Sequence, residues 1–355
     1  MTHQLKPMVQ AFRLPKVLLL FLSMHNTALG RGAAMGVYTE LTLQEMQDFT
    51  RQFNFGDLKS FKGVDAGVEN TTYFVSFNQK EFVLQIFEEQ GFDEIPFFIE
   101  LNRRLSDDGV PVASPIANQE GARLFAIKNK PAALFSRIRG STISPITPDA
   151  CRQIGEALGK MHSATQNYID LKRENHRWHR WWEGSAKRVL DFVPPKYRDM
   201  LSDQINRSGS FASHAGKLPQ GIIHGDLFCD NALFNSGSLA GIIDFYNACN
   251  GSLLFDLAIT INDWCSDESS RLDKLKTEAM MAGYTRYRPL TDQEMSHWPP
   301  AVETAALRFW ILRLVALARK RKGGPQAPPH VKDPNDFLEI LISRRHDPQC
   351  NLISR

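Results

Sequence analysis

The first third of the chain alternates apolar and polar residues in short runs that predict strands. The runs TTYFVSF (71–77) and EFVLQIF (81–87) flank the turn-forming NQK, as expected for an antiparallel hairpin. The segments LKSFKGV, ARLFAIK and PAALFSRI have the same character. This part of the chain therefore predicts a small antiparallel sheet.

Two segments of the same region have helical periodicity instead. In LTLQEMQDFTRQF (41–53) apolar residues recur at helical intervals, and Thr42 and Glu45 have the spacing of a capping box. The amphipathic segment DEIPFFIELNRRLSDDGV (93–110) contains Gly109, a residue type that commonly terminates helices. We therefore expect residues 35–139 to form a β-rich N-lobe that binds nucleotide and carries helices.

A segment rich in Gly, Ser, Thr and Pro, RGSTISPITPDA (139–150), separates this lobe from the rest of the chain. Thr147 and Pro148 predict the cap and the first turn of a helix there. The pattern beyond is mostly helical, apart from the short strand-like runs GIIH, NALF and LAGIIDF. The sequence thus predicts an α+β fold with a larger, mostly helical C-lobe over residues 140–355.

The composition is that of a folded globular protein. Of 355 residues, 43% are hydrophobic and 23% charged, which is enough for one or two cores. The net charge is +3 and the Lys and Arg residues are scattered, so no basic surface for nucleic acid is expected. The five cysteines form no CxxC pair, which argues against a disulfide framework and fits a reducing cytoplasm.

Residues 1–34 fit no part of this pattern. They contain basic residues, a short apolar run from Val17 to Leu22 and small residues after it, which loosely imitates a secretory signal. The run is too short to span a membrane. A signal peptide, a disordered extension and a start upstream of a natural start at Met35 are the alternatives. We favour the extension or the misplaced start, because the chemistry described next needs cytoplasmic nucleotide.

Acidic and amide side chains gather around two strand-like runs of the predicted C-lobe. Asp226 follows one run in IIHGDLFCDNALF, Asn231 stands five residues later, and Asp244 ends the run GIID. Carboxylate and amide oxygens are ligands that Mg²⁺ takes from proteins, while water and nucleotide phosphates complete its shell. A second carboxylate beside the metal can orient a hydroxyl and accept its proton as it attacks the γ-phosphorus. The sequence therefore predicts a phosphotransfer site.

The order of these motifs resembles a known family. H-G-D-x-x-x-x-N followed by I-D-F, behind a β-rich lobe, is similar to the aminoglycoside phosphotransferase and choline kinase branch of the kinase-like fold. Further segments from about Val37 onward resemble bacterial homoserine kinases of that fold, namely VYTELT, GVENTTYFV, IPFFIELNRRLSDDGVPV and PAALFSRIRG. The resemblance implies a two-lobe protein-kinase-like fold. It also implies ATP- and Mg²⁺-dependent phosphorylation of L-homoserine to O-phospho-L-homoserine in threonine biosynthesis.

The same resemblance implies roles for individual residues. Asp226 would be the catalytic base, and Asn231 and Asp244 would be the Mg²⁺ ligands. The loop between Gly63 and Thr72 would cover the ATP phosphates. The expected nucleotide-binding residues are Gly67, Val68, Glu69, Asn70, Thr71 and Gln85.

One position departs from the kinase pattern. Kinases of this fold carry a strand lysine that pairs with a helix glutamate, whereas FVLQIF has Gln85 at that position. A neutral amide does not supply the charge of the lysine. The homoserine kinase pattern also lacks this lysine. The sequence leaves open which cation steadies the phosphates and what Glu100, at the position of the partner glutamate, does.

Several other residues have a structural interpretation. His162, His224 and Asp256 are expected to hold the backbone or to pack in the interior rather than to react. The cluster HRWHRWWE (176–183) is expected to pack a core rather than to bind zinc or a base.

A small amino acid presents a carboxylate, which favours an arginine, and an ammonium group, which favours a carboxylate. We expect Arg313 to meet the first group and Asp230 the second. Arg139 and Arg308 are alternatives for the carboxylate, and Asp263 is an alternative for the ammonium. A solvated or structural role is a further alternative for each of these residues.

Two other functions compete with homoserine phosphorylation. The acceptor could be another small amino alcohol or an aminoglycoside, although a polycation favours an acidic pocket and ALARKRKGG is basic. The chain could instead be a catalytically inactive binding module, although such a module would be expected to lose Asp226, Asn231 and Asp244 first. In either case we expect no nucleic-acid or membrane partner, and the sequence does not determine the oligomeric state.

Overall fold

The computed structural model describes residues 39–64, 70–78, 80–323 and 331–347. The predicted N-terminal extension, residues 1–34, lies outside these ranges, so its nature stays a prediction. No helix within them is both long enough and apolar enough to cross a membrane. The cysteines that they contain are all free thiols, as the spacing predicts: Cys151, Cys229, Cys249 and Cys265.

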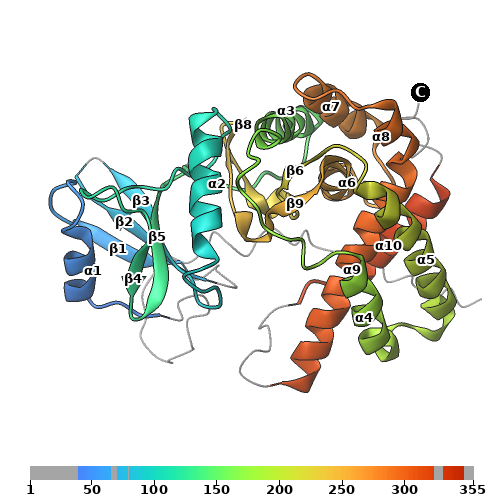
Figure 1. The fold of residues 1–355 in the computed structure, drawn as a ribbon, viewed down its shortest axis with the longest axis horizontal. Coiled ribbons are helices and arrows are strands. Elements are labelled where there is room, and N and C mark those ends of the chain that lie inside the picture. Colours follow the sequence, from blue (N-terminus) through green and yellow to red (C-terminus); the bar gives the residue numbers. More distant parts are fainter. Residues whose placement is uncertain (1–38, 65–69, 79, 324–330, 348–355) are drawn as a thin grey trace, which may run out of the picture. The chain divides into compact units, whose positions relative to one another are not determined.

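The N-terminal region is built on a five-stranded antiparallel sheet with the strand order β1-β2-β3-β5-β4 (Figure 1). The predicted hairpin is β2 paired with β3, in which Tyr73 lies opposite Leu84. The prediction of an antiparallel sheet with accompanying helices is therefore confirmed. The elements are α1 (Leu43–Thr50), β1 (Ser60–Gly63), β2 (Thr71–Ser76), β3 (Glu81–Ile86), α2 (Ile95–Asp107), β4 (Phe125–Ile127) and β5 (Lys130–Ser136).

The two faces of this sheet pack against different helices. Leu84 of β3 lies in one apolar cluster with Met46 of α1. Ala133 of β5 lies in another with Phe98 of α2. Because side chains alternate along a strand, Gln85 faces away from the α1 side. The residue that replaces the kinase lysine is therefore on the α2 side of the sheet.

Local signals at both predicted helix starts are confirmed. At α1, Thr42 Oγ1 accepts from the Glu45 backbone N–H at 3.2 Å, and the Glu45 carboxylate accepts from the Thr42 N–H at 2.8 Å. At α3, Thr147 Oγ1 accepts from the Ala150 N–H at 3.2 Å. Each side chain satisfies a backbone donor that the first helical turn leaves unpaired.

The C-terminal region is mostly helical, as predicted, with two small two-stranded sheets, β6-β9 and β7-β8. Strand β9 was not expected from the pattern, because NACNGS contains few apolar or β-branched residues. The larger elements are α3 (Pro148–Thr165), α4 (His179–Val189), α5 (Arg198–Ala215), α6 (Leu253–Trp264), α7 (Lys274–Thr285), α8 (Asp292–Ser296), α9 (Trp298–Lys322) and α10 (Pro334–His346). The shorter ones are η1 (Leu190–Phe192), η2 (Pro195–Tyr197), β6 (Gln220–Ile223), η3 (Cys229–Asn231), β7 (Ala232–Asn235), β8 (Ser238–Ile242), η4 (Phe245–Asn247) and β9 (Cys249–Ser252).

Helix α6 lies at the centre of the largest apolar cluster, and nearly every residue of it is buried. The tryptophans of HRWHRWWE pack against it: the Trp178 and Phe255 ring centroids are 4.9 Å apart, and Trp182 is fully buried. The structural interpretation of this cluster is therefore confirmed. A helix buried on all sides is a rigid support for whatever loop it contacts.

Helices α3 and α7 cross at very short range because glycines stand at the crossing. A Cβ atom on Gly155 would lie 2.1 Å from the Met280 carbonyl oxygen, and one on Gly283 would lie 2.2 Å from that of Arg152. No side chain fits at these positions unless the helices move apart. The crossing brings Tyr284 of α7 to His162 of α3, a contact on which the site below depends.

We predict that Gly155→Ala lowers the free energy of unfolding by about 1–3 kcal/mol, because the methyl group overpacks the crossing. The matched control is Gly184→Ala in α4, where no atom lies within 4 Å of the added Cβ. It should raise the free energy of unfolding by up to about 1 kcal/mol, because alanine favours a helix over glycine. Denaturant unfolding of both variants measures the difference, and equal stabilities would contradict the close crossing.

Candidate active site

A tight turn follows β6 and presents Asp226. Gly225 has φ +76°, a conformation that residues with a Cβ rarely adopt, and an added Cβ would lie 2.9 Å from the Asn247 carbonyl oxygen. The sequence H-G-D thus requires glycine between the histidine and the aspartate. The loop that follows contains Asn231 in η3, and Asp244 stands just after β8.

The buried carboxylate of Asp256, in the first turn of α6, fixes this turn. It accepts from the backbone N–H of His224 at 2.7 Å and from that of Gly225 at 2.8 Å. Farther along α6, Asp263 accepts from the Cys229 N–H at 2.7 Å, and Trp264 Nε1 donates to the Leu227 carbonyl at 3.1 Å. One helix therefore holds the loop on both sides of Asp226, which confirms the structural role expected of Asp256.

A chain of buried hydrogen bonds supports Asp256 from behind. His162 Nε2 lies 3.0 Å from the Asp256 carboxylate, and His162 Nδ1 lies 2.8 Å from the Tyr284 hydroxyl. Arg288 donates to the same hydroxyl at 2.9 Å and pairs with Glu294 at 2.6 Å. Because arginine only donates, the hydroxyl proton points to His162 Nδ1, which leaves the proton on Nε2 for Asp256. The chain therefore requires a neutral histidine.

The pKa values agree with that assignment. Burial lowers the pKa of His162, which keeps the imidazole neutral. Burial alone would raise the pKa of Asp256, but the hydrogen bond from His162 outweighs it with the help of backbone donors, and the pKa is lowered. Asp256 is thus an ionised acceptor for the N–H groups of the turn.

His224 links Asp226 to the strand that carries Asp244. Its Nδ1 accepts from the Asp226 N–H at 3.3 Å, so its Nε2 carries the proton and donates to the Ile243 carbonyl at 3.1 Å. Burial lowers the pKa of His224, as expected for a neutral ring. The structural role predicted for His224 is confirmed, and it sets the spacing of the two aspartates.

Asp226 is half-buried and lies next to a second acid. Loss of solvation and then the charge of Asp244 hold the pKa of Asp226 well above its ordinary value, while Arg308 opposes the shift. Asn247 Nδ2 donates to Asp226 Oδ2 at 3.2 Å. Two neighbouring carboxylates repel each other when both are ionised, and a cation bound between them would relieve that repulsion.

The two expected metal ligands, Asn231 and Asp244, lie beside Asp226. Asn231 Nδ2 donates to the Asp226 carbonyl at 2.8 Å, which leaves its Oδ1 as an acceptor, and the Asn231 carbonyl accepts from the Ile243 N–H at 3.0 Å. Asp244 is exposed and has φ +66°, a conformation uncommon outside glycine that clusters at functional sites. The described residues contain no group of three His, Cys, Asp or Glu side chains arranged for a metal. A site completed by nucleotide phosphates needs fewer protein ligands.

The predicted nucleotide-binding residues are only partly within the described ranges. Gly67, Val68 and Glu69 lie outside them. Asn70 and Thr71 are buried and both contact Glu88: the Thr71 hydroxyl donates to its carboxylate at 2.6 Å, and Asn70 Oδ1 accepts from its backbone N–H at 3.3 Å. These contacts anchor the end of the loop at the start of β2. Gln85 lies opposite Thr72 across the strands. A direct role in nucleotide binding stays a prediction for all six residues.

Glu100 has partners on its own helix. Its carboxylate accepts from Arg103 and Arg104 at 2.7 Å each, and the hydrogen bond from Arg103 contributes most to lowering its pKa to about 2. Arg104 also donates to the carboxylate of Asp170, which follows α3 in the chain. This chain of ion pairs joins α2 to the helical region, and it gives Glu100 a structural role in a protein that has Gln85 in place of the kinase lysine.

The two expected substrate contacts have partners within the protein. Arg313 donates to Asp336 at 2.9 Å and to the Asp333 carbonyl at 2.7 Å. Asp230 pairs with Lys332 at 2.5 Å. Binding of substrate by either residue stays a prediction. The sequence reasoning overlooked Asn247, although its position three residues after Asp244 is a usable signal.

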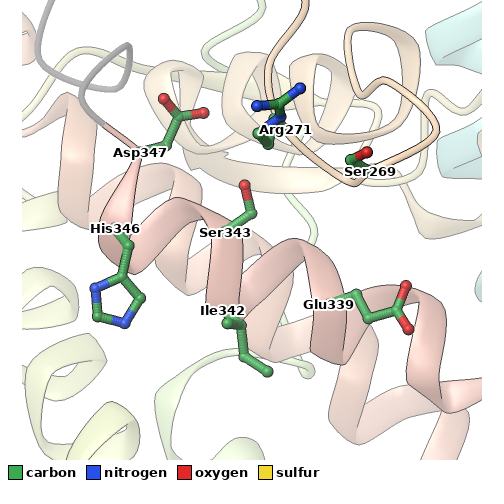
Figure 2. A pocket seen from close by; sticks show the side chains of 7 residues that line it. All are labelled: Ser269, Arg271, Glu339, Ile342, Ser343, His346 and Asp347. Atoms are coloured by element: carbon green, nitrogen blue, oxygen red, sulfur yellow. The ribbon is translucent and has the colours of Figure 1, made fainter.

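A surface cavity of about 440 Å³ lies between α10 and the segment before α7 (Figure 2). Its lining residues are Ser269, Arg271, Glu339, Ile342, Ser343, His346 and Asp347. None of them is a predicted site residue, so the cavity is separate from the convergence of Asp226, Asn231 and Asp244.

We predict that Asp256→Asn lowers the free energy of unfolding by about 3–5 kcal/mol, because an amide cannot accept from all three donors and His162 loses an ionised partner. The control is Asp149→Asn, which alters an exposed ion pair with Arg152. It should change the stability by less than about 1 kcal/mol. Equal effects of the two substitutions in thermal or denaturant unfolding would show that Asp256 does not hold the turn.

Comparison with known proteins agrees with this geometry. Residues 60–290 match the family model described as "Phosphotransferase enzyme family". The chain is 37% identical over 317 residues to a homoserine kinase of Polaromonas naphthalenivorans, covering 88% of this chain and 99% of the relative. It is 36% identical over 310 residues to a homoserine kinase of Neisseria meningitidis serogroup B, covering 87% and 99%.

Solved structures show the fold at lower sequence identity. An amicoumacin kinase superposes with a TM-score of 0.61 at 15% identity, covering 86% of this chain and 92% of that one. A microcompartment-associated aminopropanol kinase gives 0.61 at 18%, covering 88% and 97%. The predicted two-lobe, kinase-like fold is confirmed. The chain belongs to the phosphotransferase enzyme family and, within it, to the group of homoserine kinases.

Proposed function

We propose that this protein is a homoserine kinase, which transfers the γ-phosphoryl group of ATP to the hydroxyl of L-homoserine with the help of Mg²⁺. The similarity at 36–37% identity over nearly the full length of the homoserine kinases carries the proposal. The product would be O-phospho-L-homoserine. A cytoplasmic location, where ATP and homoserine are both present, follows from this proposal.

Asp226 has the surroundings of a general base for this reaction. Its carboxylate would accept the proton of the acceptor hydroxyl while the hydroxyl oxygen bonds to the γ-phosphorus and the bond to the β-phosphate oxygen breaks. Asn247 binds one carboxylate oxygen, Oδ2, and so orients the group. Because α6 holds the turn through Asp256, the Asp226 carboxylate would be presented to the acceptor in a fixed position.

The donor set fits Mg²⁺, because Asn231 Oδ1 and the Asp244 carboxylate are oxygen donors beside a second carboxylate. When bound, the cation would neutralise charge on the phosphates and lower the cost of keeping Asp226 ionised. The residues that bind the phosphates on the N-terminal side are proposed to lie in the loop from Gly63 to Thr72.

The alternatives differ in the acceptor or in the presence of activity. Solved kinases with other acceptors share only 12–18% identity with this chain, so they support the fold and not their acceptors. An inactive module is disfavoured because Asp226, Asn231 and Asp244 are all present and brought together.

A panel of acceptors tests the proposal. L-Homoserine, L-serine, choline and kanamycin are incubated with the protein, ATP and Mg²⁺, and ADP release is followed. L-Homoserine should give the highest kcat/KM. A higher value for choline or kanamycin would overturn the acceptor assignment, and no release above background with any of them would overturn the kinase assignment.

We predict that Asp226→Asn lowers kcat by about 100-fold or more while the melting temperature changes little, because removal of a general base typically costs that much. The control is Asp230→Asn, an aspartate of the same loop that pairs with Lys332. The kcat of Asp230→Asn should fall much less. A rise in its KM for L-homoserine would support the separate prediction that Asp230 binds the ammonium group. Turnover of Asp226→Asn within a few-fold of wild type would exclude Asp226 as the base.

A further inference from the structure

Two arginines, Arg177 and Arg308, flank the turn that carries Asp226. They come from distant parts of the chain, the segment before α4 and the middle of α9. Both lie close enough to Cys249 to lower its pKa, although burial raises that pKa overall to about 11. A concentration of positive charge beside the catalytic base is unexpected for a kinase whose acceptor is a cation.

Arg308 is buried behind the turn. It is 3% exposed, and its NH1 donates to the Gly225 carbonyl at 2.8 Å, one residue before Asp226. Its Nε is buried without a hydrogen-bond partner among the described residues. The guanidinium carbon lies 4.9 Å from the Phe309 ring centroid, which orients the group. One edge of the guanidinium is therefore used by the turn, and the edge that contains Nε is not.

Arg177 reaches the same place from the exposed side. Its NH1 donates to Asn247 Oδ1 at 2.6 Å, and Asn247 Nδ2 donates to Asp226 Oδ2. Because arginine has no acceptor, this contact determines which end of the amide faces Asp226. The Arg177 carbonyl accepts from Trp182 Nε1 at 2.9 Å, so the segment is anchored on the packed tryptophan cluster.

We propose that Arg177 and Arg308 form the site for the acceptor's carboxylate and thereby select an amino acid over an amino alcohol. The inference rests on the proposed homoserine kinase function and assigns its acceptor specificity to named residues. A guanidinium edge binds a carboxylate through two parallel hydrogen bonds, and the edge of Arg308 that contains Nε has no hydrogen-bond partner at Nε among the described residues. Arg177 is exposed and can turn toward the same anion.

Charge balance favours these arginines over the others considered. Arg313 is paired with Asp336, and Arg139 with Glu81 at 3.0 Å. Arg177 and Arg308, by contrast, have no ion-pair partner among the described residues. Arg177 donates to a side-chain amide, and Arg308 donates to a backbone carbonyl and lies over two aromatic rings. Burial lowers the pKa of Arg308 and Arg177 adds to that effect, although the nearby charges of Asp226 and Asp256 oppose it. An acceptor carboxylate would add a negative charge hydrogen-bonded directly to the guanidinium.

Removing the carboxylate from homoserine gives 3-amino-1-propanol, which keeps the hydroxyl, the ammonium and the chain between them. The experiment measures kcat/KM for both acceptors in wild type, Arg177→Ala and Arg308→Lys, with ATP and Mg²⁺. Wild type should strongly prefer homoserine. In Arg177→Ala the ratio of the two values should fall roughly 10–100-fold, because a hydrogen-bonded charge contributes a factor of this size. Arg308→Lys should lower it as well, because lysine cannot form the two parallel bonds.

Arg180→Ala is the matched control, since Arg180 is an exposed arginine three residues after Arg177. Its ratio should equal that of wild type. If both arginine variants lose activity on the two acceptors equally, the arginines only position the turn and the inference is wrong. An unchanged ratio in Arg177→Ala, which does not disturb the core, overturns it even if Arg308→Lys fails to fold. Absence of homoserine phosphorylation by wild type would instead overturn the proposed function.

Discussion

The two hydrogen bonds from the His224 and Gly225 backbone to the Asp256 carboxylate are the constraint on which the site depends. A turn with a left-handed glycine is not stable by itself, and a buried carboxylate is costly without donors. Each satisfies the other. The neutral His162 donates the third hydrogen bond to the Asp256 carboxylate, and Tyr284 holds His162 in place across the glycine crossing of α3 and α7. Residues far from Asp226 therefore determine where its carboxylate lies.

Much of the fold could be predicted because its signals are local. Capping by Thr42 and Thr147, the hairpin of β2 and β3 and the helical character beyond residue 148 all depend on neighbouring residues. Strand β9 was missed because its extended conformation depends on pairing with β6, and the local sequence NACNGS gives no sign of that pairing. The boundary near residue 140 and the nature of residues 1–34 stay predictions.

The site was predictable in part for the same reason. Asp226, Asn231 and Asp244 are close in sequence and follow short strands, so their convergence could be inferred from spacing. The partners of Glu100 and Arg313 could not be inferred in this way, because a long charged side chain can pair with any opposite charge within its reach. Arg177 and Arg308 reach the turn from segments about 50 and 80 residues away in sequence, and spacing alone does not relate such distant positions.

We propose that the fixed turn and Asp244 together create a cation site through which the nucleotide is held. Calorimetric titration of ATP into wild type and Asp244→Ala, each with Mg²⁺ and with a chelator, tests this proposal. Wild type should bind ATP more tightly with Mg²⁺ than without it, because the cation bridges the carboxylate and the phosphates. Asp244→Ala should show equal, weak affinity in both conditions. A variant that binds Mg·ATP as tightly as wild type would show that Asp244 does not hold the cation.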